Sequence, residues 1–132
     1  MTVIRIEPYW LDARDALAIH DRQIAEHGGI AGVRDERLLD SALARPVNQW
    51  HYGLDDAAAL AAAYAFGIAR NHPFADGNKR TAWVSARLFL ALNGHVLEFV
   101  QQDAIETVLA LAAGELSEEE LADWFRQHLV AG

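Results

Sequence analysis

The chain has 132 residues, with 11 Lys and Arg against 19 Asp and Glu, a net charge of −8 and no cysteine. This length fits one domain, so we expect residues 1–132 to form a single domain whose apolar core needs no disulfide. The acidic balance disfavours a protein that binds nucleic acid along its backbone, because such proteins carry a broad basic face. The longest apolar run, residues 57–69, is shorter than the ~20 residues of a membrane helix, and residues 1–7 lack the pattern of a secretion signal. We therefore expect a cytoplasmic protein that does not bind membranes.

The first third of the chain predicts one short strand and two helices. Apolar and polar residues alternate over residues 2–6, which is typical of a strand. A helix is expected over residues 11–26, and the glycine-rich segment 28–32 ends it. A second helix is expected over residues 35–44. It ends before Pro46, because proline disfavours helical geometry in the residue that precedes it.

The third helix is expected to lie at the centre of the fold. It follows Asp55 and Asp56, whose carboxylates suit a helix N-terminus, and it is rich in alanine and apolar nearly all round. A segment containing Pro73 interrupts the helical pattern. A fourth helix is expected over residues 78–93, with Gly94 at its end.

The last third of the chain predicts a second short strand and two more helices. The strand covers residues 95–100, and we expect it to pair with residues 2–6. Helices are expected over residues 103–113 and 117–130, and the second of them opens with a capping box made by Ser117 and Glu120. These elements predict an all-α fold, a compact helical bundle with at most two very short strands.

The segment between the third and fourth helices concentrates the residues that can carry chemistry, and it includes the only lysine of the chain. In chain order these residues are His72, Asp76, Gly77, Asn78, Lys79 and Arg80. The backbone N–H groups at residues 77–80 open a helix, so they form a ready anion site beside two cationic side chains. The glycine lets a ligand approach the backbone closely.

Two side chains complete this set. Asp76 offers an oxygen ligand suited to Mg²⁺, which proteins commonly hold with one or two carboxylates and the phosphates of a substrate. His72 can accept a proton near neutral pH. A base, a magnesium ligand and a phosphate cradle together favour transfer of a phosphorus-containing group from a nucleotide to a hydroxyl. Each residue alone also has a structural interpretation, since Asp76 can cap the helix and His72 can pack in the core.

The spacing His72-x-Phe-x-Asp76-Gly77-Asn78-x-Arg80 resembles the motif of Fic proteins, and its Asn-Lys-Arg-Thr form resembles the Doc (death-on-curing) branch. Residues 34–46 and 87–94 are similar to the segments that flank the motif in that branch. The resemblance extends over about residues 19–98.

The resemblance implies a Fic-type fold with a central helix–loop–helix active site, and the toxin of a toxin–antitoxin pair. In Fic enzymes the motif histidine is the general base and the acidic residue holds Mg²⁺, while the Gly-Asn and Arg positions bind the nucleotide phosphates. These roles fall on His72, Asp76, Gly77, Asn78 and Arg80. Some Fic proteins carry an inhibitory helix with the pattern [S/T]-x-x-x-E-[G/N], which this sequence lacks, so the antitoxin is expected to be a separate protein.

Two positions depart from the AMP-transferring Fic enzymes: Lys79 replaces a glycine, and Trp83 replaces a second arginine. The Doc branch shares both departures, and it transfers the terminal phosphoryl group of ATP to a threonine of translation elongation factor Tu. We therefore expect an ATP- and Mg²⁺-dependent protein phosphotransferase that blocks translation and binds no nucleic acid directly. AMP transfer to a protein hydroxyl is the alternative, and a catalytically dead partner-binding module is the second alternative.

Two further features have weaker interpretations. Residues 47–54 are expected to be irregular and, by the resemblance, to form the flap that holds the target's side chain, with Trp50, His51 and Tyr52 in contact with the target. The dipeptide His20-Asp21 is typical of metal-dependent phosphohydrolases. Because no second metal cluster accompanies it, we expect it to have arisen by chance.

Overall fold

A computed structural model of the chain describes residues 5–130. These residues form six helices and two strands of two residues each, which confirms the predicted all-α fold. The helices are α1 (Ala13–His27), α2 (Glu36–His51), α3 (Ala57–Asn71), α4 (Asn78–Leu92), α5 (Gln101–Ala112) and α6 (Glu118–His128), and the strands are β1 (Val96–Leu97) and β2 (Leu129–Val130). No helix within residues 5–130 combines the length and the apolar character needed to cross a membrane.

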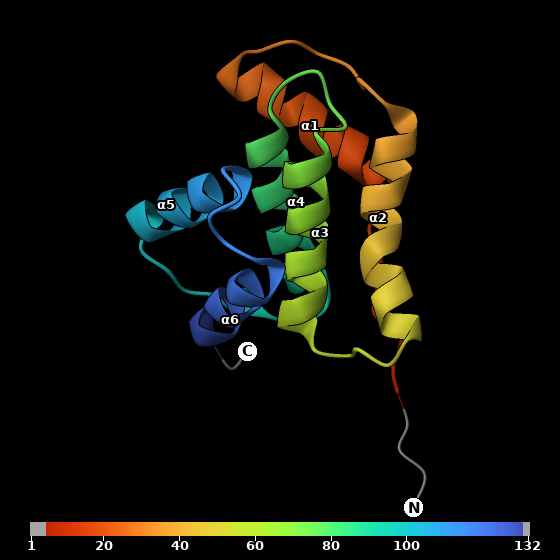
Figure 1. Ribbon diagram of the computed structural model, residues 1–132, viewed down its shortest axis with the longest axis vertical. Coiled ribbons are helices and arrows are strands. Elements are labelled where there is room, and N and C mark those ends of the chain that lie inside the picture. The colour runs from red at the N-terminus through yellow and green to blue at the C-terminus, as the bar shows by residue number, and fades with distance from the viewer. Residues whose placement is uncertain (1–4, 131–132) are drawn as a thin grey trace, which may run out of the picture.

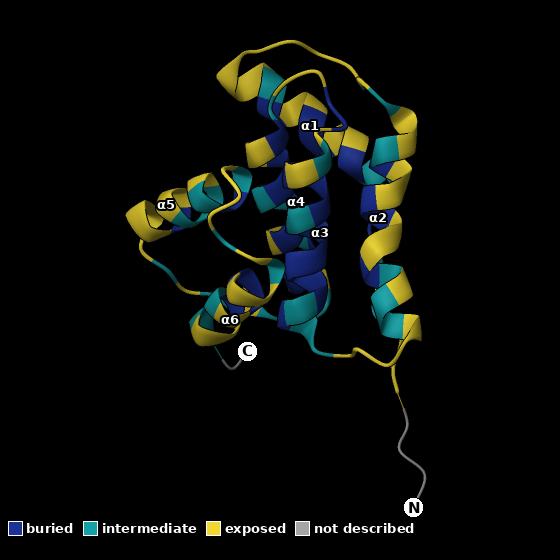
Figure 2. Cartoon of the chain, viewed as in Figure 1, coloured by how far each residue is buried: buried dark blue, intermediate teal, exposed yellow. Residues whose placement is uncertain are grey.

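Helix α3 is the centre of the bundle, as its composition predicts. It packs against α2, α4 and α6, and Figure 1 shows it between α2 on one side and α5 and α6 on the other. Most of its residues are buried, including the whole run from Leu60 to Ala65 (Figure 2). Because that run is mostly alanine, the neighbouring helices approach α3 closely, and α3 therefore fixes the position of the loop that follows it.

Helix α2 is longer than the sequence predicts. The expected end before Pro46 is wrong, because the helix continues through this buried proline to His51. A proline inside a helix leaves the carbonyl four residues earlier, here that of Ala42, without its N–H donor. That stretch of α2 packs tightly on α3: a Cβ at Gly67 would lie 3.0 Å from the Ala42 Cα and 3.2 Å from its carbonyl oxygen. The α2–α3 contact therefore outweighs the local preference of proline.

The strand pairing also differs from the prediction. Val96 and Leu97 pair antiparallel with Val130 and Leu129, so the C-terminal end of the predicted sixth helix is strand β2. Residues 2–4 of the other predicted strand lie outside the described residues, and Arg5 and Ile6 are not in a strand. Two-residue strands carry too little alternation to identify their partner from the sequence.

Polar contacts fasten α6 to the start of α3 and to α2. The predicted caps are confirmed: Asp56 accepts the N–H of Ala58 at 3.2 Å, and Ser117 forms the expected capping box with Glu120. Arg126 of α6 forms an ion pair with Asp56. Arg45 of α2 forms another with Glu118. The pair between Arg126 and Asp56 lies at the end of α3 where the chain enters that helix.

Helix α1 buries one face that carries polar side chains. Leu17 is 37% exposed, whereas the buried residues are Ala16, Ile19, His20 and Gln23. These four positions are spaced three and four residues apart and therefore share one face of the helix. That face includes a histidine and a glutamine.

Candidate active site

The loop of residues 72–77, called the motif loop below, joins α3 to α4 at one end of the bundle (Figure 1, top). It begins at His72, whose φ of 51° and ψ of 56° are left-handed. His72 is the one non-glycine residue within residues 5–130 that has a positive φ. Such a conformation costs on the order of 1–3 kcal/mol and persists only where surrounding contacts impose it.

Arg34 supplies two of these contacts. Its Nε donates to the carbonyl oxygen of His72 at 2.8 Å, and its Nη2 donates to that of Asn71 at 3.0 Å. A guanidinium at the C-terminus of α3 satisfies carbonyls that have no intrahelical partner and complements the negative end of the helix dipole. Arg34 therefore holds the backbone of His72 in place.

Residues 29–35, called the covering segment below, lie along the motif loop. The N–H groups of Arg34 and Asp35 donate to the carbonyl of Pro73 at 2.7 and 3.1 Å, and Ala75 N–H donates to the carbonyl of Gly32 at 3.0 Å. Val33 and Phe74 form an isolated antiparallel bridge. The sequence predicts only a turn here, so this contact is a finding of the structure.

Asp76 is exposed, and backbone donors hold both of its carboxylate oxygens. Oδ1 accepts the N–H of Gly77 at 2.8 Å, and Oδ2 accepts that of Ile30 at 3.2 Å. A Cβ at Gly29 would lie 2.8 Å from Oδ2, so the covering segment passes close to the carboxylate. The N-cap of α4 is Gly77, with φ 73°, and therefore the capping interpretation of Asp76 is wrong.

The carboxylate of Asp76 fits a magnesium ligand. An ionised carboxylate has about four acceptor positions, so the two hydrogen bonds leave others for a cation. No group of three metal-binding side chains occurs within the described range 5–130. Any Mg²⁺ at this position would therefore be held by one carboxylate together with phosphate oxygens, an arrangement common for this ion.

Asn78 has a structural role in addition to the predicted one. Its buried side chain accepts from Phe74 N–H and donates to the Phe74 carbonyl, both at 3.0 Å. The amide thus uses its oxygen and one of its two N–H donors on the motif loop. A phosphate contact by Asn78 is left to the second amide N–H or to the backbone N–H.

The start of α4 offers a site for an anion. The first intrahelical bond runs from Thr81 N–H to the Gly77 carbonyl at 3.0 Å, so the N–H groups of residues 78–80 point out of the helix end. The N–H of Gly77 is already taken by Asp76, which leaves three of the four expected donors. The exposed side chains of Lys79 and Arg80 add positive charge beside them.

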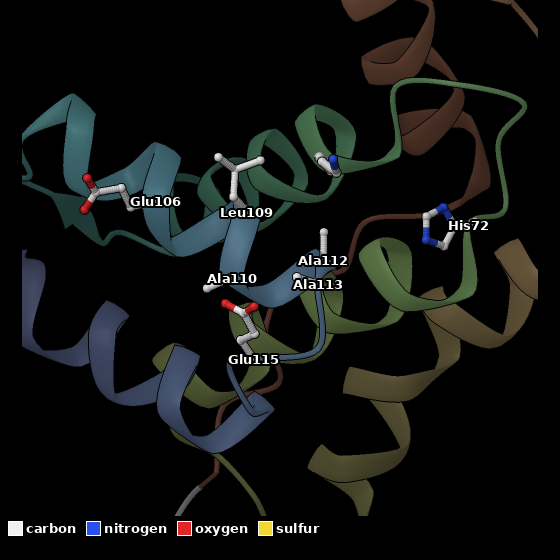
Figure 3. Close-up of a pocket in the computed structure, with 8 residues that line it drawn as sticks. His72, Glu106, Leu109, Ala110, Ala112, Ala113 and Glu115 are labelled. Carbon is white, nitrogen blue, oxygen red and sulfur yellow. The ribbon is translucent and has the colours of Figure 1, made fainter.

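One pocket of about 1020 Å³ brings the predicted residues together. Its lining includes His72, Asp76, Gly77, Asn78, Lys79 and Arg80. A second pocket of about 610 Å³ is also lined by His72 and Lys79. Figure 3 shows His72 across this second pocket from the C-terminal half of α5. The exposed imidazole therefore lies where two hollows meet, which suits a group that acts between two reactants.

Comparison with known proteins identifies the family. The model of the Fic/DOC family matches residues 10–90, more than half of the chain. The chain belongs to the Fic/DOC family. It is similar to "Protein kinase doc" of Escherichia phage P1, with 33% identity over 118 residues that cover 89% of this chain and 93% of the relative. It is also similar to "Toxin Doc" of Mycolicibacterium smegmatis, with 46% identity over 88 residues, 64% of this chain and 65% of the relative.

The aromatic segment expected to form the Fic flap lies away from the motif loop. Trp50 and His51 belong to α2, so the prediction of an irregular segment is wrong for residues 47–51. The α2–α3 connection, which contains Tyr52, is at the opposite end of α3 from His72 (Figure 1). A helix of this length separates the two ends by about 20 Å. Trp50 packs instead against Trp10, with ring centroids 6.2 Å apart. The covering segment, not residues 47–54, borders this Fic/DOC motif loop.

The pocket of about 1020 Å³ is also lined by residues outside the predicted site. Trp83 stands where AMP-transferring Fic enzymes have an arginine, and its ring lies in an aromatic cluster with Phe99 and Phe125, at centroid distances of 5.3 and 5.8 Å. Arg87 lines the pocket one turn further along α4, with its guanidinium carbon 5.2 Å from the Phe99 ring centroid. The signal for Arg87 was its spacing of seven residues from Arg80, which places both on one face of the helix.

Proposed function

We propose that this protein is the toxin of a toxin–antitoxin pair and transfers the terminal phosphoryl group of ATP to a Thr or Ser hydroxyl of a target protein. One observation carries the proposal: a histidine, a carboxylate, a helix N-terminus and two cationic side chains line a single pocket. The names of the two relatives, a protein kinase and a toxin, support it.

In the proposed reaction the N-terminus of α4 binds the phosphates of ATP. The N–H groups of residues 78–80 donate to phosphate oxygens, and Lys79 and Arg80 balance their charge. Mg²⁺, when bound at Asp76, neutralises charge that develops on the phosphates. The net charge of −8 is compatible with this, because ATP needs only a local basic site.

His72 acts on the acceptor. Its imidazole accepts the proton of the target hydroxyl while the hydroxyl oxygen forms a bond to the terminal phosphorus of ATP. The bond from that phosphorus to the oxygen bridging it to the second phosphate breaks, and ADP leaves. The hydrogen bonds from Arg34 fix the backbone from which the imidazole projects, so little freedom is lost when the reactants align.

The absence of an arginine at position 83 favours phosphoryl transfer over AMP transfer. The Trp83 ring packs among aromatic side chains and supplies no charge at that position. The next arginine after position 83 on the same helix is Arg87, displaced by about 6 Å along the axis. A cation shifted by this distance suits a nucleotide that lies at a different position along α4 from the nucleotide of AMP-transferring Fic enzymes.

The experiment is mass measurement of a target protein after incubation with this protein, ATP and Mg²⁺. Elongation factor Tu is the target that we propose from the family resemblance. An added mass of about 80 Da supports phosphoryl transfer, about 329 Da indicates AMP transfer, and no addition contradicts both. His72→Ala is the matched control, because it removes the base and leaves the phosphate site unchanged.

Expression in cells tests the toxin proposal separately. We expect growth to stop when the protein is expressed without its antitoxin and to continue with His72→Ala. Toxicity that survives this substitution would favour the dead partner-binding module, because binding alone needs no base.

A further inference from the structure

A buried imidazole lies directly beneath the motif loop. His20 of α1 is only 1% exposed, although no motif in the sequence predicts a role for it. Its Nε2 is 2.7 Å from the backbone carbonyl oxygen of Asp76. Its ring stacks on Phe74, with centroids 4.0 Å apart and planes 6° from parallel. His20 therefore contacts the motif loop both through its ring face and through a polar atom.

We propose that His20 is a positioning residue that fixes the carboxylate of Asp76, and with it the place of Mg²⁺. This inference rests on the function proposed above for the same site. It assigns a role to the His20-Asp21 dipeptide, but not the metal-binding role that is typical of phosphohydrolases.

The hydrogen bond requires one tautomer. A carbonyl oxygen only accepts, so Nε2 of His20 carries the proton and donates it. The carbonyl of Asp76 and the N–H of Gly77 belong to the same planar trans peptide and point in opposite directions. Because His20 holds the carbonyl on the core side, the N–H is directed to the other side, where Oδ1 of Asp76 accepts it at 2.8 Å.

The orientation of the carboxylate thus depends on a chain of contacts that begins in the core. Ile30 N–H completes it by donating to Oδ2 at 3.2 Å. The neighbouring Gly77, with its φ of 73°, has no side chain to restrain it, and a Cβ there would be 3.8 Å from Nε2 of His20. His20 is anchored because Ala16 and Ile19 on the same face of α1 are buried. Loss of such an outer contact typically lowers metal affinity or activity by about 10- to 100-fold.

Two substitutions separate positioning from simple packing. His20→Phe keeps an aromatic ring against Phe74 and removes the donor. His20→Gln removes the ring and keeps an N–H donor the same number of bonds from Cα. Packing alone predicts that the phenylalanine variant is the better of the two, whereas positioning predicts the reverse. Asp21→Asn is the matched control, since Asp21 is exposed on the same helix.

The kinetic measurement is the Mg²⁺ dependence of transfer at saturating ATP. We expect His20→Phe to raise the Mg²⁺ concentration needed for half-maximal rate, or to lower kcat, by about 10- to 100-fold. We expect His20→Gln to stay within about threefold of the wild type, and Asp21→Asn to match it. A fully active His20→Phe variant overturns the proposal. Equal loss in both His20 variants also overturns it, because the ring and not the donor then matters.

A second measurement needs no activity. Nitrogen NMR of the wild-type protein reports which ring nitrogen of His20 carries the proton, and we expect Nε2; a proton on Nδ1 alone overturns the proposal. The amide signal of Gly77 should shift in His20→Phe and return toward its wild-type position in His20→Gln. If the wild-type protein transfers no phosphoryl group, the proposed function fails, while these spectra still test the role of His20.

Discussion

The amide of Asn78 allows a quantitative test of what holds the motif loop together. Asn78→Ala removes a donor and an acceptor that both engage the backbone of Phe74 at 3.0 Å in a buried setting. A buried group left without a partner costs about 1–3 kcal/mol, so the two groups of Phe74 together predict a loss of about 2–6 kcal/mol.

The chain provides a matched control for this substitution. The Asn93 side chain bonds to both backbone groups of Tyr9 in the same way: it accepts from the N–H at 2.9 Å and donates to the carbonyl at 3.1 Å. These two bonds to Tyr9 are exposed, so water replaces the lost partners in Asn93→Ala, which also removes one partly buried bond from Nδ2 to the Phe89 carbonyl at 2.8 Å. We expect a loss of about 1 kcal/mol there.

The assay is urea unfolding followed by circular dichroism, with the free energy of unfolding obtained by linear extrapolation. A cost of less than about 1 kcal/mol for Asn78→Ala, or one no larger than that of Asn93→Ala, would mean that the amide does not hold the motif loop together. A variant that keeps its stability and loses only affinity for ATP would instead support the phosphate-binding role first predicted for the Asn78 side chain.

Three further substitutions test separate features. Burial raises the pKa of Tyr64 to about 12, so the free energy of unfolding should fall by up to about 3 kcal/mol as pH rises from 10 to 12. Tyr64→Phe should abolish this fall, and the control Tyr52→Phe should leave it unchanged. Alkaline urea titrations measure it. Arg34→Gln should lower kcat by about 10- to 100-fold with little change in KM for ATP, because it releases the backbone of the base. Arg87→Leu should raise KM for ATP by about tenfold with kcat unchanged, and Arg14→Leu, at the far end of α1, should change neither.

Each of these has a contradictory outcome. Equal alkaline destabilisation in the wild type and Tyr64→Phe would mean that another group titrates. A selective rise in KM for Arg34→Gln would place its guanidinium on the nucleotide and not on the α3 carbonyls. An unchanged KM for Arg87→Leu would remove this residue from the ATP site.

The sequence predicts the parts of the site that are local in the chain. His72 and Arg80 are eight residues apart, so one loop and the first turn of one helix bring them together. The sequence also predicts the central position of α3, because a helix that is apolar nearly all round must be buried. Neither prediction depended on knowing which distant segments meet.

The contacts that order the motif loop from outside come from distant parts of the chain. Arg34 reaches His72 across 38 positions, and His20 reaches Asp76 across 56. No periodicity or motif specifies such a pairing, since it follows from how α1 and α2 pack on α3 and α4. The end of α2 was predicted wrongly for the same reason. The preference of the residue before Pro46 for non-helical geometry is local, whereas the contact between Ala42 and Gly67 joins distant parts of the chain.

The left-handed backbone at His72 connects catalysis to evolution of the fold. A glycine would adopt this conformation with about 1 kcal/mol less strain, so the position is one at which stability alone would select against histidine. Lineages that lose the need for toxicity would therefore gain stability by replacing this histidine with glycine. The motif loop and the hydrogen bonds that Asn78 and Arg34 make to it would remain. An inactive copy is then expected to persist as a well-folded protein able to occupy an antitoxin, and its signature in a genome would be a glycine at position 72 within an otherwise intact motif.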